Sequence, residues 1–302
     1  MRKILHGAAR VVRAILGIVP TWSTLRTLGQ SKLLLMTALI PFLGTLILFN
    51  QQFVDFLLLS PSIVGHWIGV TGSSAEEASR NMTLGRLQLT YFGLVFLGLG
   101  SFLFALSCPN ELKRNDGISE FIEKERPLIT RSRIGLLVTD VVADYLKNHG
   151  EEARGPELLR DLAYPMDLEG LFDSVLTDVT ENIDSNTDSP IAQNDSRLTS
   201  DSDDKADHDP LGIYTMLGTV DVDAVARILY NSIRAYRGFW SSFHSHAEKY
   251  LTDFLTLRYL ALDHSKPALR IVVATSYAIG FTVLFLPTAH TFYLIVHRLV
   301  VS

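Results

Sequence analysis

LQLTYFGLVFLGLGSFLFALSCPN, at residues 87–110, is a run of apolar and small polar residues without Asp, Glu, Lys or Arg. A helix rises about 1.5 Å per residue, so about 20 apolar residues cross a bilayer core of about 30 Å. Residues 33–54 and 271–297 form two more uncharged and strongly apolar intervals. The sequence therefore predicts transmembrane helices at residues 33–54, 87–108 and 271–297.

A fourth uncharged interval, residues 56–75, is less apolar, because Pro61 and Gly65 interrupt it and its end is polar. We interpret residues 55–75 as an interfacial or re-entrant segment. Such backbone is tolerated at membrane depth only where protein covers it or water reaches it. If residues 56–70 formed a full span instead, the large domain that follows would lie on the opposite side of the membrane.

The amino-terminal region is basic, with six Lys or Arg residues and no acid among its first 32 residues. Basic residues near the first span stay on the cytoplasmic side, which predicts a large cytoplasmic domain and a location in the plasma or inner membrane. Residues 1–20 have the pattern of an amphipathic helix lying in the membrane plane. The alternative is a charged tail that only sets topology. The predicted membrane-surface ligands are Arg2, Lys3, Arg10 and Arg13.

Small residues recur at spacings of four and seven in the second and third predicted spans. Residues of this size allow helices to approach closely in lipid. We therefore predict that the spans pack on one another, or on a second copy of the chain. The residues predicted to form these contacts are Gly93, Gly100, Ala274, Ser276, Ala278 and Gly280.

Residues 110–267 carry 17 basic and 29 acidic side chains, a net charge of −12. This charge repels nucleic acid, which we do not expect as a partner. Apolar residues at helical spacing predict a soluble subdomain over residues 111–184. Residues 185–210 are dominated by Ser, Asp, Asn and Thr, and predict a disordered acidic linker. The helices expected in the subdomain are 118–124, 128–147, 156–163 and 168–182.

The last soluble part, residues 211–266, carries the longest periodic pattern, which begins at a capping residue, Asp221. An unbroken helix from there to about His264 would be about 66 Å long, with Gly238 or the serine pair after it as possible breaks. Its aromatic stripe is either a core seam against residues 128–147 or a face for self-association or a partner. The residues of the candidate face are Leu229, Ile233, Tyr236, Trp240 and Phe243.

Motifs of known enzymes are absent from the sequence, which has no glycine-rich phosphate loop and no nucleophile elbow. His244 and His246 are two residues apart and point to different sides of a helix, so they do not share a metal. Asp140 and Asp144 either hold a cation or form a solvated acidic face. We predict no catalytic residue, no metal and no cofactor.

These features predict an all-α membrane protein with about three transmembrane helices and a helical cytoplasmic domain inserted between the second and third. The expected function is that of a membrane-anchored interaction or regulatory protein whose acidic domain binds a protein partner or forms a homo-oligomer. The alternative is an oligomeric membrane-perturbing or channel-forming effector gated by that domain. The uncharged spans and the kink-prone prolines Pro41 and Pro287 permit this alternative.

Overall fold

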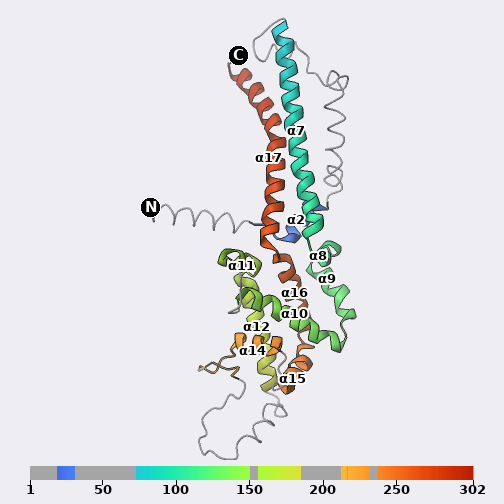
Figure 1. Ribbon diagram of the computed structural model, residues 1–302, viewed down its shortest axis with the longest axis vertical. Coiled ribbons are helices and arrows are strands. Elements are labelled where there is room, and N and C mark those ends of the chain that lie inside the picture. The colour runs from blue at the N-terminus through green and yellow to red at the C-terminus, as the bar shows by residue number, and fades with distance from the viewer. Residues whose placement is uncertain are drawn as a thin grey trace, which may run out of the picture. The chain divides into compact units, whose positions relative to one another are not determined.

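The computed structural model describes six stretches of the chain, and these fold almost entirely as helices (Figure 1). They form two compact units, each treated by itself: one spans Pro109–Pro267, and the other combines Val19–Cys108 with Ala268–Ser302. The predicted first span, most of the predicted amino-terminal and interfacial segments, and the predicted linker lie outside the described residues. The described residues are 19–30, 73–149, 156–184, 212–215, 217–231 and 237–301.

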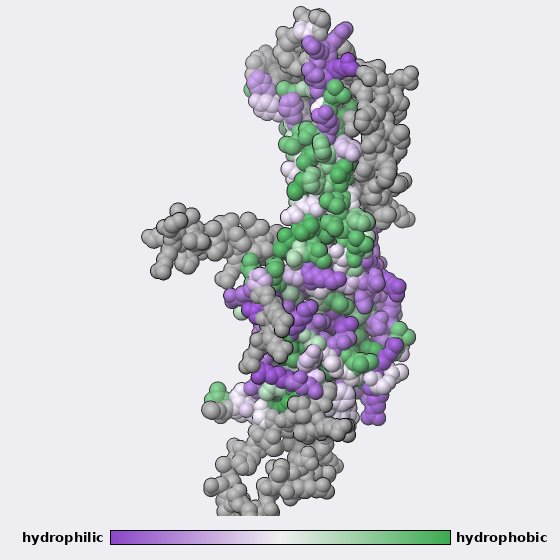
Figure 2. Space-filling view, in the orientation of Figure 1, coloured by the Kyte–Doolittle hydropathy of each residue, from purple (hydrophilic) through white to green (hydrophobic). Residues whose placement is uncertain are grey.

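Two long helices dominate the second unit, α7 (Ser73–Ser107) and α17 (Pro267–Val301), and each has 35 residues. Both contain an apolar stretch long enough to cross a membrane, of which 33% and 28% is buried. A core helix of a soluble protein would be mostly buried, whereas hydrophobic side chains cover the exposed surface of this pair (Figure 2). The chain therefore has two helices suited to crossing a bilayer.

Both helices are longer than the predicted spans, 87–108 and 271–297. The extension at the start of α7 is polar and rich in Ala and Glu, which are good helix formers outside lipid. The apolar interval therefore marks the hydrocarbon-sized part of the helix and not its ends.

A short helix that the sequence did not reveal, α2 (Trp22–Gly29), packs on the end of α7. The Thr21 hydroxyl caps it by accepting a hydrogen bond from the backbone N–H of Thr24. The ring of Trp22 is fully buried, with its centroid 6.0 Å from that of Phe104. A helix of eight residues is marginal in isolation, so this contact stabilises α2.

The first unit is a helical domain built around α10 (Arg131–His149), which contacts helices from both predicted soluble parts. Its apolar residues at helical spacing, from Ile134 to Tyr145, are buried. The other elements are α8 (Asn110–Arg114), α9 (Ile118–Glu125), η1 (Arg126–Leu128), α11 (Glu157–Ala163), α12 (Met166–Asp184), α14 (Val222–Asn231), α15 (Arg237–Ala247) and α16 (Leu251–His264).

The core seam expected between the periodic pattern and residues 128–147 is seen, because α10 packs on α14 and α16, and α12 packs on α15 and α16. Each of these helices has an apolar face that needs a partner, and burial of these faces is the main favourable term in folding. Helices before and after the linker provide these partners for one another. The domain therefore has one shared core.

The long helix expected between Asp221 and His264 is broken among the described residues, because α15 ends at Ala247 and α16 begins at Leu251. The expected breaks at Gly238 and the serine pair are wrong, since these residues lie inside α15. The predicted helix cap at Asp221 is present: its carboxylate accepts a hydrogen bond from the backbone N–H of Ala224, 3.0 Å away. A helix of about 66 Å would extend far beyond α10, whose 19 residues span about 28 Å. Separate helices bury the aromatic stripe against α10 and α12, which one straight rod does not allow.

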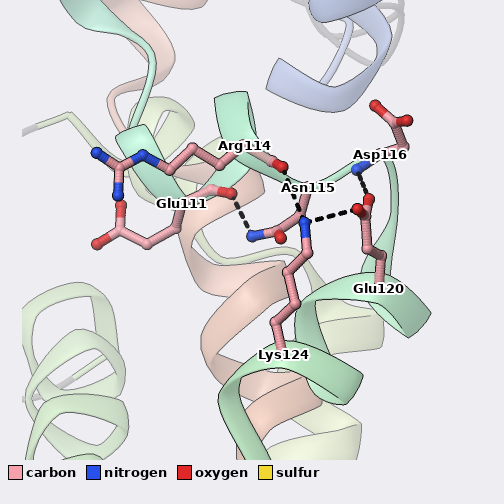
Figure 3. A network of polar contacts seen from close by, with 6 residues as sticks. All are labelled: Glu111, Arg114, Asn115, Asp116, Glu120 and Lys124. Atoms are coloured by element: carbon pink, nitrogen blue, oxygen red, sulfur yellow. Dashed lines mark hydrogen bonds and ion pairs between the residues drawn. The ribbon is translucent and has the colours of Figure 1, made fainter. Parts of the chain in front are cut away.

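A polar network shapes the turn between α8 and α9, at the start of the soluble domain (Figure 3). The Asn115 amide donates to the Glu111 carbonyl oxygen at 2.8 Å, and the Glu120 carboxylate accepts from the backbone N–H of Asp116. The Lys124 ammonium lies 2.6 Å from Glu120 and 3.4 Å from the Arg114 carbonyl oxygen. These bonds satisfy backbone groups at two helix ends, as capping residues do.

Candidate functional site

The described part of the predicted association face lies inside the helical domain. The side chains of Leu229 and Phe243 are fully buried, and Trp240 is half-buried with its indole N–H donating to the Leu229 carbonyl oxygen at 3.4 Å. Ile233 and Tyr236 lie outside the described residues. The described part of the stripe therefore forms a core seam, and Leu229 and Phe243 do not offer a surface to a partner.

The histidine and aspartate pairs singled out in the sequence have internal partners. The Nδ1 atoms of His244 and His246 lie 2.5 Å and 2.9 Å from the carbonyl oxygens of Trp240 and Ser242, respectively. The guanidinium of Arg258 lies 2.9 Å from the Asp140 carboxylate. The described residues contain no group of three or more His, Cys, Asp or Glu side chains arranged to hold a metal ion.

Burial raises the pKa of Asp144, the other member of the aspartate pair, while Arg258 and Lys147 oppose this rise. The carboxyl is therefore shielded from water and faces cations of the same chain. The two aspartates form part of an intramolecular charge network.

A cluster of stacked rings with acidic neighbours lies elsewhere in the domain, where α10 ends and α12 begins. The ring of Tyr145 stacks on Phe172 at a centroid distance of 4.1 Å and on His149 at 5.2 Å. The ring of Tyr164 meets His149 edge to face at 5.1 Å. We call Tyr145, His149, Tyr164 and Phe172, with the carboxylates of Glu169 and Asp173, the His149 cluster.

Local helix geometry brings these residues together. Tyr145 and His149 are one turn apart on α10, and Glu169 and Asp173 are one turn apart on α12, so each pair shares a helix face. Tyr164 ends α11, where its backbone N–H donates to the Arg160 carbonyl oxygen at 2.8 Å. Three helices thus converge on one small region.

Carboxylates surround the exposed side of the cluster. The Glu169 carboxylate lies 3.4 Å from Nε2 of His149, and the Asp223 carboxylate accepts a hydrogen bond from the Tyr145 hydroxyl at 3.0 Å. Burial raises the pKa of Asp173, and the nearby charges of Glu169 and Asp223 raise it further. The region therefore concentrates negative charge where solvent screens it incompletely.

Two polar atoms of the cluster are buried without a hydrogen-bond partner among the described residues, Nδ1 of His149 and Oδ1 of Asp173. Most buried polar groups in proteins do have partners, and each one left without costs about 1–3 kcal/mol. The side chains of His149 and Glu169 still keep 24% and 36% of their surface exposed. The edge of the cluster is therefore open to solvent.

Chemically, the cluster is suited to holding a cationic group. Carboxylates form charge-assisted hydrogen bonds with Lys and Arg side chains, and the Glu169 carboxylate of the cluster is partly exposed. Burial, followed by the hydrogen bond to Asp223 and the charges of Asp223 and other nearby acids, raises the pKa of Tyr145. Burial likewise raises the pKa of Tyr164.

Sequence reasoning did not find this cluster. His149 follows a run of apolar residues at helical spacing without any motif, and Phe172 is one of many apolar residues at such spacing. The signal that was present is the charge of α12, which has six acidic and no basic residues among its 19. The spatial convergence of α10, α11 and α12 is tertiary, so the sequence alone does not show it.

The small residues predicted to pack the spans lie mostly between α7 and α17. A Cβ atom added to Gly93 would lie 3.0 Å from the Gly280 carbonyl oxygen, and one added to Gly280 would lie 3.0 Å from the Gly93 carbonyl oxygen. A Cβ atom on Gly100 would lie 3.0 Å from the ring of Tyr277 and 3.4 Å from Cβ of Ser276. The contacts are therefore made within one chain.

The remaining predicted site residues are placed differently. Ala274 is half-buried and Ala278 is exposed on α17. The predicted membrane-surface residues Arg2, Lys3, Arg10 and Arg13 lie outside the described residues.

Comparison with known proteins finds no relative of this chain. The geometry above comprises two membrane-suited helices in close contact and a helical domain with an acidic, ring-stacked cluster. No protein-family model, no curated protein and no solved structure matches the chain.

Proposed function

We propose that this chain is a membrane-anchored interaction protein whose helical domain binds a basic segment of a protein partner at the His149 cluster. The observation that carries the proposal is the pair of buried atoms without partners, His149 Nδ1 and Asp173 Oδ1, beside partly exposed carboxylates. A cationic side chain would contact the partly exposed Glu169 carboxylate and offset the negative charge around the buried Asp173 oxygen.

The charge of the domain supports a basic partner. The exposed side of α12 is acidic along its length, and the soluble portion as a whole has a net charge of −12. Complementary charge speeds association and disfavours partners of like charge. An acidic partner or nucleic acid would be repelled by the same surface.

The membrane arrangement in this proposal goes further than the two membrane-suited helices. We place residues 33–54 as an additional span, the large domain in the cytoplasm and the protein in the plasma or inner membrane. The support is the uncharged length of that interval and the six basic residues before it. The spans would hold the domain at the membrane surface, where it meets its partner.

The alternative of a channel formed by several copies has less support. Copies would assemble through the small residues of the spans, but Gly93, Gly100 and Gly280 are used in the contact between α7 and α17. These small residues therefore give no support to assembly of several copies.

Binding of a basic peptide to the full chain tests the proposal. The chain is placed in nanodiscs of neutral phosphatidylcholine, and a fluorescent peptide of alternating Lys and Ser is titrated by anisotropy. We expect binding that Glu169→Gln with Asp173→Asn weakens at least about fivefold, because two charge-assisted contacts are lost. A peptide of alternating Glu and Ser should not bind.

The matched control is Asp178→Asn with Glu181→Gln, which removes the same charge from the same helix away from the cluster. Less than about a twofold change is expected, since exposed charges are screened by salt. Equal weakening by both pairs would show diffuse attraction and overturn the site. Sedimentation that gives a dimer blocked by the cluster variant would replace the basic partner with self-association.

A further inference from the structure

A groove with a cavity volume of about 390 Å³ lies between the first half of α7 and the last part of α17. Its wall on α7 is Arg86, while its walls on α17 combine hydroxyl and apolar side chains. The groove lies within the second unit. The lining residues are Arg86, Pro287, Thr288, Thr291, Phe292 and Ile295.

A chain of hydrogen bonds holds the Arg86 guanidinium at this groove. Nη2 of Arg86 donates to Oγ1 of Thr291 at 2.6 Å, and the Thr291 hydroxyl donates to the Pro287 carbonyl oxygen at 2.7 Å. A guanidinium carries five N–H donors, and Thr291 accepts from one nitrogen. Among the described residues, no carboxylate forms an ion pair with Arg86, so its charge is not neutralised there.

The position of Arg86 along α7 places it at the depth of lipid headgroups. About 21 residues separate it from Ser107, the end of the helix, which corresponds to about 31 Å, the thickness of a hydrocarbon core. Phe292 and Tyr293 of α17 are exposed, as aromatic residues at a membrane interface are. Hydrophilic side chains gather at this end of the apolar pair (Figure 2).

We propose that this groove binds the phosphate group of an anionic phospholipid. The planar guanidinium of Arg86 presents parallel N–H donors that match two phosphate oxygens. The exposed Thr288 hydroxyl adds a donor, and the exposed apolar surfaces of Phe292 and Ile295 suit the start of an acyl chain. A zwitterionic lipid is disfavoured because its ammonium group would approach the same cation.

Native mass spectrometry of the full chain in mild detergent tests this site with three probes: phosphatidylglycerol, phosphatidylcholine and inorganic phosphate. We expect phosphatidylglycerol to bind at least about tenfold more tightly than phosphatidylcholine, with millimolar phosphate displacing little of it. Arg86→Gln should remove this preference. Arg86→Lys keeps the charge without the planar fork, and should give an intermediate affinity.

The control is Arg80→Gln, which removes one exposed cation from the same helix outside the groove and should leave the preference unchanged. Thr291→Val removes the hydroxyl that holds Arg86 and should weaken binding. The helix pair should still fold, and Arg86 keeps its positive charge. Equal binding of both lipids, or an equal loss with Arg80→Gln, would overturn the site. Full displacement by inorganic phosphate would identify a free-phosphate site and overturn the lipid assignment.

Discussion

At the residue scale, the buried carboxylate of Asp173 in the His149 cluster lowers the stability of the folded domain. Burial and neighbouring acids raise the pKa of Asp173, so the folded domain favours its protonated form. A group whose pKa rises on folding contributes stability below its ordinary pKa, and this contribution is lost as the pH rises through the raised value. At neutral pH the ionised carboxyl therefore weakens the fold that presents it.

Replacement of Asp173 by Asn should stabilise the full chain at neutral pH, by no more than about 1 kcal/mol because the side chain is partly exposed. The gain should shrink as the pH falls below the raised pKa of Asp173, where the wild-type carboxyl is protonated as well. Urea unfolding in detergent micelles, followed by circular dichroism at two pH values, measures the difference. A variant less stable than wild type at neutral pH would contradict this account.

Two glycines of the soluble domain form a second residue-scale test. A Cβ atom on Gly135 would lie 3.1 Å from the His244 imidazole and 3.3 Å from the Trp240 ring. The imidazole is hydrogen-bonded to the Trp240 carbonyl oxygen and has little room to move. We expect Gly135→Ala to cost about 1–3 kcal/mol of unfolding free energy.

Gly170→Ala is the matched control, because a Cβ atom there meets no other atom within 4 Å. The same change in an open helix position should be neutral or add about 0.5–1 kcal/mol. Chemical unfolding of the two variants side by side measures both effects. If the two alanines had the same effect, tight packing at Gly135 would not be the cause.

At the element scale, the contact between α7 and α17 depends on backbone approaching backbone. Gly93 and Gly280 let each helix present a carbonyl oxygen to the other, and the Tyr277 hydroxyl donates to Ser101 at 3.3 Å on the same interface. In lipid, close packing and interhelical hydrogen bonds replace the hydrophobic effect as the source of association. The pair therefore tolerates little added volume at these glycines.

Gly93→Ala should loosen the helix pair, since its Cβ atom would lie 2.7 Å from Cγ of Leu284 and 3.0 Å from a backbone oxygen that cannot rotate away. We expect a loss of about 1–3 kcal/mol, measured as a lower thermal midpoint in mild detergent. Gly85→Ala, on the same helix with no atom within 4 Å, should be neutral. A midpoint unchanged by Gly93→Ala would show that α7 and α17 do not rely on this contact.

At the scale of the whole molecule, the proposed arrangement has a soluble domain on the cytoplasmic side, attached to spans before and after it. Topology reporters inserted at residue 75 and within residues 185–210 test this arrangement. The basic amino-terminal region predicts an outer position for the first site and a cytoplasmic position for the second. A reporter in residues 185–210 that is active on the outer side would mean that residues 56–70 cross the membrane.

Long, uncharged intervals and helical periodicity identified the helical class, α7, α17 and most helices of the soluble domain. These features are local, because the length of an apolar run and the spacing of its residues are written along the chain. The predicted ends of the helices were less accurate. At α7, for example, the helix continues past the apolar run into polar residues that favour helix.

Tertiary structure decided the break between α15 and α16, the burial of Leu229 and Phe243, and the contact of His149 with Glu169. The physical reason is that each depends on which helix faces which. A stripe of apolar residues is the same in sequence whether it becomes core or surface. Only the shared packing of α10, α12 and the later helices selects between these outcomes.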